Sequence, residues 1–168
     1  AKLDLADILV EQGLKAPRYQ WRDRASGDAA TFDMSCLEGL TGFPYRLQCE
    51  QWKLTRAAYD ALLKEPTATV EFGWAASDVV QDAEGVTLTL SKDGMTRQEG
   101  GSFLIGADGA SSAVRRAIGS TFEGFTYPEQ WVVASTPVDF AAKLPGLAPV
   151  TYTADADEWF VLLQTRDL

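Results

Sequence analysis

The sequence of 168 residues contains no histidine. Histidine is the commonest general base, a frequent zinc ligand and the activating partner in Ser-His and Cys-His enzymes, so its absence excludes those sites. The two cysteines, Cys36 and Cys49, are too few for a disulfide framework and have no metal-binding spacing. We predict that both are buried as small hydrophobic residues. The sequence therefore predicts no metal site, and we assign no catalytic residue.

Basic residues are also scarce, with 15 lysines and arginines against 24 aspartates and glutamates and a net charge of -9. Nucleic-acid binding depends on lysine and arginine side chains that neutralise phosphates, so we expect no nucleic-acid partner. The apolar runs are far shorter than the ~20 residues that span a bilayer. No signal peptide is recognisable either, so we expect a cytoplasmic protein without a membrane partner.

Two segments have the apolar spacing of amphipathic helices. In residues 4–12 we expect Asp4 to cap the start of a helix and Gly13 to end it. Residues 51–64 repeat the helical period more regularly, and Pro66 prevents much continuation. These are the helices that the pattern predicts most directly.

The period of the apolar residues changes to two in the middle of the chain. We predict strands over residues 70–74 and 86–90, joined by turn-forming residues into an antiparallel β-meander that extends from about residue 69 to 98. Further short strands are expected at residues 19–22 and 30–34 and, separated by proline-containing loops, within 121–168. The fold class is therefore predicted to be α+β.

A more specific pattern follows the meander, where an apolar strand at 103–105 leads through a glycine turn into a helix. Gly106 and Gly109 carry no side chain and let the backbone approach a neighbour closely. Ser111 or Ser112 can cap the helix that follows. Free N–H groups at such a turn favour a phosphate or a sugar.

Asp108 modifies what this turn can bind. Its carboxylate would repel a bare phosphate but would accept hydrogen bonds from ribose or ribityl hydroxyls, and Arg115 could supply a countercharge. The arrangement suits the sugar-phosphate part of a dinucleotide. The residues alone leave an alternative open, in which an ordinary turn is followed by a solvated helix face that carries Arg115 and Arg116.

The motif also resembles a known family. Gly106-Ala107-Asp108-Gly109, followed by Ser112 and Val114-Arg115, is similar to the GxDGxxSxVR fingerprint of class A FAD-dependent aromatic monooxygenases, the family of para-hydroxybenzoate hydroxylase. In that family the motif is associated with FAD and NAD(P)H binding. The resemblance implies cofactor contacts at Gly106, Asp108, Gly109, Ser112 and Arg115. Residues 48–54 resemble the family's entry to a helix at which a glutamine contacts the flavin, which implies a further contact at Gln51.

The order of elements along the chain fits the same family, and residues 122–133 resemble its branch of phenol and hydroxyphenylpropionate hydroxylases. The domains of the family interleave along the sequence. The resemblance therefore implies that 1–47 and 120–168 are parts of the substrate domain and that 48–119 is part of the FAD-binding domain. The expected structure is a piece of an FAD/NAD(P)-binding fold with a β-meander and an antiparallel substrate-domain sheet.

The resemblance implies a parent enzyme that uses FAD, NAD(P)H and O2 to hydroxylate a small phenol-type aromatic substrate. The flavin performs the chemistry, so the missing histidine is no obstacle. The family's opening GxGxxG motif and its later glycine-aspartate motif are not found. We therefore expect an internal fragment that is inactive alone and binds FAD weakly or not at all. The alternative is a stand-alone module that binds a small ligand or a protein; no residue indicates the oligomeric state.

Overall fold

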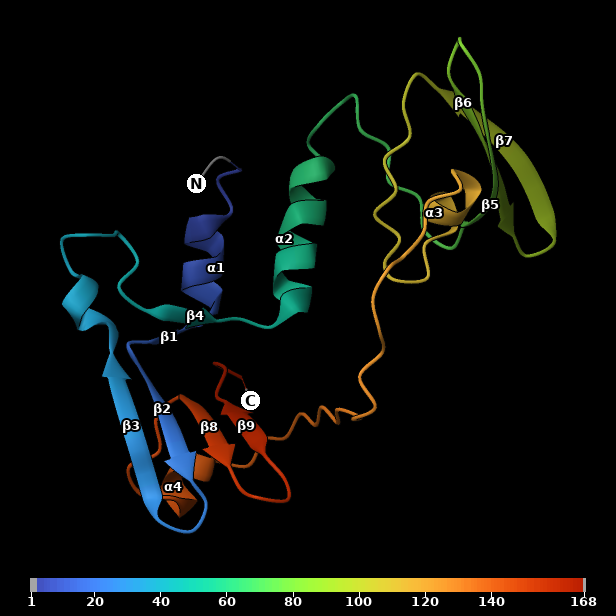
Figure 1. Ribbon diagram of the computed structural model, residues 1–168. Helices are drawn as coiled ribbons and strands as arrows, with labels where there is room; N and C mark the ends of the chain where they lie inside the picture. The colour runs from blue at the N-terminus through green and yellow to red at the C-terminus, as the bar shows by residue number, and fades with distance from the viewer. Residues whose placement is uncertain (1–2, 168) are drawn as a thin grey trace. The chain divides into compact units, whose positions relative to one another are not determined.

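The computed structural model describes residues 3–167 and divides the chain into two compact units. The first unit combines residues 1–68 with 132–168, and the second comprises 69–131. Figure 1 shows the order of elements in each of them. No helix formed by residues 3–167 is both long and apolar enough to cross a bilayer.

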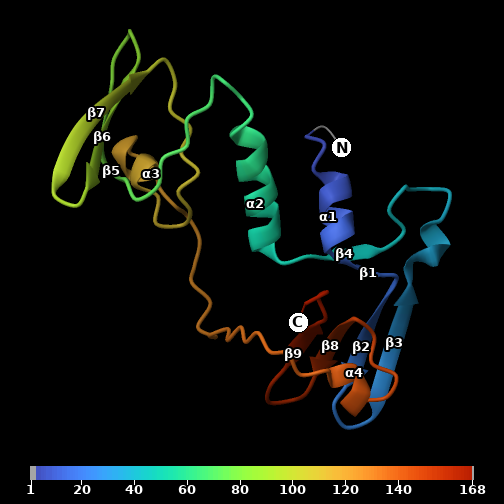
Figure 2. The same cartoon turned by 180° about the vertical axis from the view of Figure 1, so that it is seen from behind.

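The first unit is built on a four-stranded sheet with the strand order β3-β2-β8-β9. Strands β2 (Arg18–Asp23) and β3 (Gly27–Asp33) form an antiparallel hairpin, β8 (Val150–Ala154) runs parallel to β2, and β9 (Phe160–Leu163) is antiparallel to β8. Figures 1 and 2 both show β2, in blue, beside β8, in red. This sheet therefore joins segments from opposite ends of the sequence.

The buried centre of the first unit lies along β2 and β8. Val150 and Thr151 are fully buried, and Gln20 is buried between them and the loop that follows α4 (Phe140–Lys143). The Gln20 amide nitrogen donates to the Gly146 carbonyl at 2.9 Å, and its amide oxygen accepts from the Ala148 N–H at 2.8 Å. The loop therefore closes one face of the sheet through a buried polar side chain.

Two helices and a small ladder complete the first unit. Helix α1 (Ala6–Gln12) leads into β1 (Leu14–Ala16), which pairs with β4 (Arg46–Gln48), and β4 leads into α2 (Gln51–Leu62). The 3-10 helix η1 (Met34–Leu37) follows β3. At the end of α1, a Cβ atom on Gly13 would lie only 2.8 Å from the Leu47 side chain, so glycine permits α1 to pack closely on β4.

The second unit contains an antiparallel meander and one short helix. Strands β5 (Ala75–Gln81), β6 (Val86–Lys92) and β7 (Met95–Gly101) pair in sequence order, and α3 (Ala113–Ala117) contacts β5. Asp93 and Gly94 have φ angles of 49° and 78° in the tight turn between β6 and β7. This left-handed conformation is typical of the hairpin turn that the sequence predicts.

The predicted α+β class is confirmed, and helices and strands are found close to most of the expected positions. The first strand of the meander was misplaced, because Gly73 has a φ of 81° and Lys92 donates to the Phe72 carbonyl, which leaves residues 70–74 irregular. Asp4 does not cap α1. Its own φ of 51° turns the chain, and Leu5 occupies the N-cap position instead.

Two further expectations about burial are wrong. The segment 103–105 forms no strand, and Phe103 and Ile105 are 91% and 89% exposed, because no other described strand lies beside this segment to complete a ladder. Cys36 is exposed, since none of the residues of η1 is buried, and Cys49 is half-buried. The apolar character of these residues therefore did not predict whether they are buried.

Candidate cofactor-binding site

The turn before α3 is organised by the carboxylate of Asp108. Its Oδ1 atom accepts a hydrogen bond from the Ser112 hydroxyl at 2.5 Å, and its Oδ2 atom accepts from the N–H groups of Ala113 at 2.6 Å and Val114 at 3.3 Å. The Ser112 Oγ atom in turn accepts from the Arg115 N–H at 2.9 Å. Ser112 is therefore the N-cap residue of α3, and Asp108 binds the N–H groups at the start of the helix.

These hydrogen bonds lower the pKa of Asp108 from its usual 3.8 to about 2. The Ser112 hydroxyl contributes most, and the N–H groups of Val114 and Ala113 act in the same direction. The carboxylate is therefore ionised at neutral pH and can only accept hydrogen bonds. It is exposed to solvent, and Oδ1, which accepts only from Ser112, can still accept from one further donor such as a sugar hydroxyl.

The two glycines of the turn are required for different reasons. A Cβ atom on Gly106 would lie 2.8 Å from both Cβ and Cγ1 of Val114, which is closer than real side chains approach. Gly109 has open space around it but adopts a φ of 77°, which side chains other than glycine disfavour. Gly106 thus allows the chain to pass against α3, whereas Gly109 turns it.

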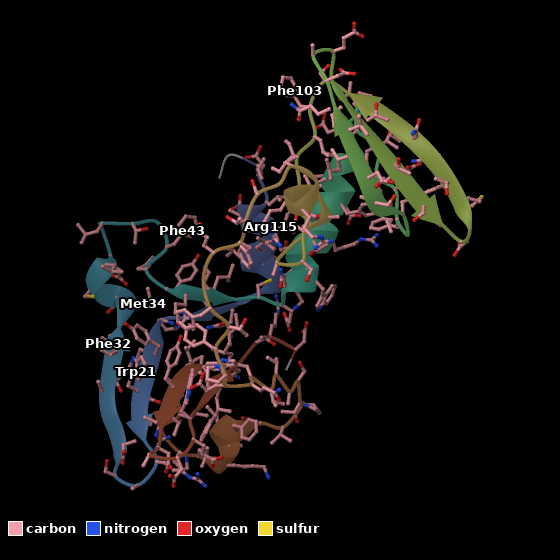
Figure 3. All side chains as sticks on the ribbon, turned by 45° about the vertical axis from the view of Figure 1, so that its right-hand side comes forward. Trp21, Phe32, Met34, Phe43, Phe103 and Arg115 are labelled. Atoms are coloured by element: carbon pink, nitrogen blue, oxygen red, sulfur yellow. The ribbon has the colours of Figure 1, made fainter. Side chains whose placement is uncertain are left out.

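Arg115 is held over the turn instead of extending into solvent. Its Nη1 atom donates to the Ala110 carbonyl at 2.7 Å, and its guanidinium carbon lies 4.6 Å from the centre of the Phe122 ring. The neighbouring Arg116 is the exposed member of the pair. Arg116 likewise donates to the Ser111 carbonyl at 2.6 Å. Arg115 thus places a positive charge beside the glycine turn, and Figure 3 labels this side chain.

A cleft of about 700 Å³ lies in the same unit beside the turn. Its lining combines apolar and polar side chains, and two of the polar ones are carboxylates. The apolar lining residues include Val79, Val86, Phe103, Leu104, Val114 and Ile118, and the polar ones are Gln81, Asp82, Glu84, Ser102, Ser112 and Arg115. Residues 106–112, called the DG turn below, contribute Gly106 and Ser112 to this lining, whereas Asp108 and Gly109 are not among the lining residues.

Gln51 is the first residue of α2 and belongs to the first unit. Its carbonyl accepts from the Thr55 hydroxyl at 3.2 Å, whereas its exposed side chain makes no hydrogen bond to any residue from 3 to 167. The amide is therefore available to a ligand. The structure brings together Gly106, Asp108, Gly109, Ser112 and Arg115 in one turn, and it describes Gln51 in the other unit.

Sequence reasoning missed a polar network around Lys53, which is 5% exposed. Its Nζ atom lies 2.7 Å from Glu50 Oε2 and 2.6 Å from Asp167 Oδ2, and it donates to the Gln12 carbonyl at 3.2 Å. Glu50 also accepts from the Thr165 hydroxyl at 2.7 Å. The spacing of Glu50 and Lys53 is a weak signal for a pair on one helix, but no local pattern indicates the distant partners.

The electrostatics of this network are those of a closely paired cluster. Hydrogen bonding to Lys53, assisted by Thr165, lowers the pKa of Glu50 from 4.5 to about 2. The contact with Asp167, followed by the contact with Glu50, raises the pKa of Lys53. Both groups are therefore charged at neutral pH, and the network holds the first turn of α2 in place. Among residues 3–167 no cluster suited to a metal ion is found.

Comparison with known proteins identifies the family. A family model described as FAD binding domain matches residues 6–160. The chain belongs to this family of FAD-binding domains. Its membership confirms the relationship that the DG fingerprint predicted.

The relatives of the chain are monooxygenases. It is 33% identical over 140 residues to 6-hydroxy-3-succinoylpyridine 3-monooxygenase HspB of Pseudomonas putida, which covers 83% of this chain and 36% of the relative. It is 29% identical over 163 residues to para-nitrophenol 4-monooxygenase of a Pseudomonas species, and this match covers 97% of this chain and 40% of the relative. The chain therefore spans well under half the length of these relatives.

Two solved structures show the same fold. The crystal structure of p-nitrophenol 4-monooxygenase PnpA from Pseudomonas putida has a TM-score of 0.85 at 24% identity and covers 95% of this chain and 40% of its own. The structure of the flavin-dependent monooxygenase PieE, in complex with FAD and substrate, has a TM-score of 0.73 at 19% identity. The match covers 97% of this chain and 31% of PieE. The roles of the six predicted contact residues and the predicted domain boundaries stay predictions.

Proposed function

We propose that the protein containing this chain is an FAD-dependent monooxygenase that uses NAD(P)H and O2 to hydroxylate a small phenol-type aromatic substrate. The observation that carries the proposal is the family match over residues 6–160. Relatives named for nitrophenol and for 3-(3-hydroxy-phenyl)propionate support a phenolic substrate. We place the reaction in the cytoplasm, where NAD(P)H is supplied.

The DG turn fits a dinucleotide in its chemistry. Gly109 turns the backbone, and the ionised Asp108, exposed to solvent, accepts hydrogen bonds. When bound, FAD would supply the redox chemistry with O2. Asp108 would bind hydroxyls of a cofactor sugar, Arg115 would offset negative charge nearby, and the Gln51 amide would orient the flavin ring.

The sequence left one alternative to a hydroxylase fragment, a stand-alone module that binds a small ligand or a protein. The relatives bear on the choice, because 6-hydroxy-3-succinoylpyridine 3-monooxygenase, para-nitrophenol 4-monooxygenase and 3-(3-hydroxy-phenyl)propionate hydroxylase are all named for an oxygenation reaction. No observation in the structure favours the module. We therefore retain the hydroxylase as the proposed function of the whole protein.

The test is cofactor content and turnover of the FAD-containing protein with Asp108 intact or changed to alanine. The unchanged protein should carry FAD and convert a phenol to a hydroxylated product as NAD(P)H is consumed. Asp108→Ala should weaken FAD binding about tenfold or more, the usual scale for losing a charge-assisted hydrogen bond. Asp78→Ala, which removes an exposed carboxylate from β5, is the matched control and should leave FAD binding unchanged.

The outcomes separate the proposal from the role of the residue. A protein without FAD that forms no hydroxylated product would contradict the proposed function. A protein that hydroxylates phenols but binds FAD equally well with Asp108→Ala would keep the function and remove Asp108 from the site.

A further inference from the structure

One face of the four-stranded sheet carries stacked aromatic side chains. Trp21 on β2 and Tyr152 on β8 are opposite each other in the parallel ladder, and their rings stack with centres 4.8 Å apart and planes 15° apart. Tyr19, two residues before Trp21 and therefore on the same face, stacks on Phe32 of β3 at 4.7 Å. Figure 3 labels Trp21 and Phe32 on their neighbouring strands.

The aromatic face is the accessible face of this sheet at Trp21. The opposite face holds Gln20 and Thr151, both buried beneath the loop that follows α4. Trp21 in contrast remains 47% exposed, although its ring is among the largest apolar surfaces of the unit. A half-exposed tryptophan stacked on a tyrosine offers a flat surface on which another ring can stack.

Arg46 brings a positive charge to the same place. Its Nη1 atom donates to the Tyr152 hydroxyl at 3.0 Å, and the fully buried Ala16 lies opposite it in the β1–β4 ladder. Arg46 is partly buried, yet among residues 3–167 no carboxylate lies within 4.0 Å of its guanidinium. Arg24, Arg56 and Arg97, by comparison, each pair with a carboxylate.

An unpaired guanidinium in a partly buried position is costly, because it gives up water without gaining an anion. An anionic ligand would restore that interaction through the N–H groups that Tyr152 does not use. The protein is otherwise strongly acidic, with a net charge of -9, so an anion is not attracted to it in general. An anion would therefore be held by Arg46 itself and not by the overall charge of the chain.

We propose that Arg46, Tyr152 and Trp21 form a binding site for an aromatic anion, in which the ring stacks on Trp21 and an anionic oxygen group binds Arg46. This inference rests on the proposed function, for which the ligand is the aromatic substrate. Tyr152 positions the guanidinium through its hydroxyl and supports the stack from behind. The site therefore favours phenols that carry a carboxylate over neutral phenols of the same shape.

The location agrees with that role. Strand β4 carries Arg46 and leads directly into α2, whose first residue is Gln51, the predicted flavin contact. The two positions are five apart in the sequence, with four residues between them, so their Cα atoms lie at most about 18 Å apart. The strand that carries Arg46 therefore continues into the helix that carries the predicted flavin contact.

The test uses the 168-residue chain and two ligands of nearly equal shape, 4-hydroxybenzoate and its neutral amide, 4-hydroxybenzamide. Binding is measured by calorimetry and by the NMR shift of the Trp21 indole N–H. We expect both ligands to bind saturably, and the Kd of 4-hydroxybenzoate should be about tenfold lower than that of 4-hydroxybenzamide. This factor is the scale of one charge-assisted hydrogen bond. Arg46→Met should abolish this preference for the anion, and Trp21→Leu should weaken the binding of both ligands by the same factor.

Two further variants separate the site from a general effect of charge or folding. Arg56→Met removes the same charge from an exposed pair on α2 and should leave the preference unchanged. Tyr152→Phe keeps the ring but removes the hydroxyl that holds Arg46, so it should reduce the preference without abolishing ring binding. If Arg46→Met does not fold, Arg46→Gln keeps a polar side chain and provides the same comparison.

Three outcomes would overturn the inference: equal binding of the anion and the amide, a preference that survives loss of Arg46, or no saturable binding of either ligand. FMN serves as a further probe, and tighter binding of FMN that depends on Arg46 would assign the surface to the flavin instead of the substrate. None of these measurements needs FAD or turnover. Failure of the proposed function would therefore appear separately, as a whole protein without FAD or hydroxylated product.

Discussion

The Nζ atom of Lys53 lies 2.6 Å from a carboxylate oxygen of Asp167, a residue 114 positions later in the chain. The same ammonium group contacts Glu50 and the carbonyl of Gln12. One side chain thus joins the end of α1, the first turn of α2 and the segment that follows β9. Because Gln51 stands between Glu50 and Lys53, this network fixes the position of the predicted flavin contact within the first unit.

Replacing Lys53 by methionine should destabilise the first unit strongly. Methionine keeps the length of the apolar stem but leaves the carboxylate of Glu50, whose side chain is only 13% exposed, without its cation. We expect the free energy of unfolding to fall by about 3 kcal/mol, the lower end of the cost of removing one partner of a buried pair, because the second carboxylate, Asp167, is exposed. Urea denaturation, with amide hydrogen exchange on α2 to report on this unit, measures the loss.

Arg56→Met is the matched control on the same helix. Arg56 pairs with Asp60, but its side chain is 68% exposed, so the cost should stay below about 0.5 kcal/mol. A loss of similar size in both variants would show that the Lys53 network contributes no more than a surface ion pair.

Local features of the fold were predictable from the sequence. Helix α2 has regular apolar spacing, and the β6–β7 hairpin has Asp93-Gly94 at its turn, so each is specified by residues close together in the chain. The DG turn was predictable for the same reason. The contacts of Asp108 all lie within six residues of it.

Long-range features were not predictable. No local pattern indicates that β2 pairs in parallel with β8 or that Lys53 contacts Asp167. The apolar spacing of a strand and the charge of a side chain do not identify the distant segment that each will contact. The strand expected at 103–105 fails for a related reason. Its apolar residues fit a buried strand, but a strand also needs a neighbour, and the sequence of one segment does not supply it.

Acid should selectively weaken the DG turn. The folded state lowers the pKa of Asp108 from 3.8 to about 2, so the ionised carboxylate stabilises the fold above pH about 4, and this contribution is lost as the pH falls through about 2. In Asp108→Asn the side chain cannot ionise. The stability difference between the two proteins should therefore be constant at neutral pH and shrink between pH about 4 and about 2.

Hydrogen exchange of the α3 amides across this range, together with a carboxyl NMR titration of Asp108, tests the prediction. Asp78→Asn on β5 is the comparison variant, since Asp78 is an exposed aspartate outside the turn. A carboxyl group of Asp108 that titrates near 3.8 would contradict the hydrogen-bonded geometry of the turn.

Gly106→Ala should disrupt the packing of the turn on α3. The added Cβ atom would meet Val114 at 2.8 Å, and we expect a loss of about 1–3 kcal/mol from overpacking. Gly100→Ala is the control, since a Cβ atom there meets nothing within 4 Å. Combining Gly106→Ala with Val114→Ala should recover part of the loss, so denaturation of the four proteins of this cycle should give a coupling energy of at least about 0.5 kcal/mol. Strict additivity of the two changes would rule out the contact as the cause.

Gln20→Leu tests whether a buried amide is what holds the loop after α4 on the sheet. Leucine has a similar volume, but it leaves the Ala148 N–H, which now donates to the Gln20 amide oxygen at 2.8 Å, buried without an acceptor. An unsatisfied buried donor costs about 1–3 kcal/mol, whereas Gln98→Leu on the exposed side of β7 should change stability by less than about 0.5 kcal/mol. The loss should be accompanied by faster hydrogen exchange at Ala148 than at the ladder amides of β8. If Gln20→Leu is as stable as the unchanged chain and the Ala148 N–H remains protected from exchange, the hydrogen bonds of the Gln20 amide do not hold this loop. Hydrophobic packing would then be what keeps the loop on the sheet.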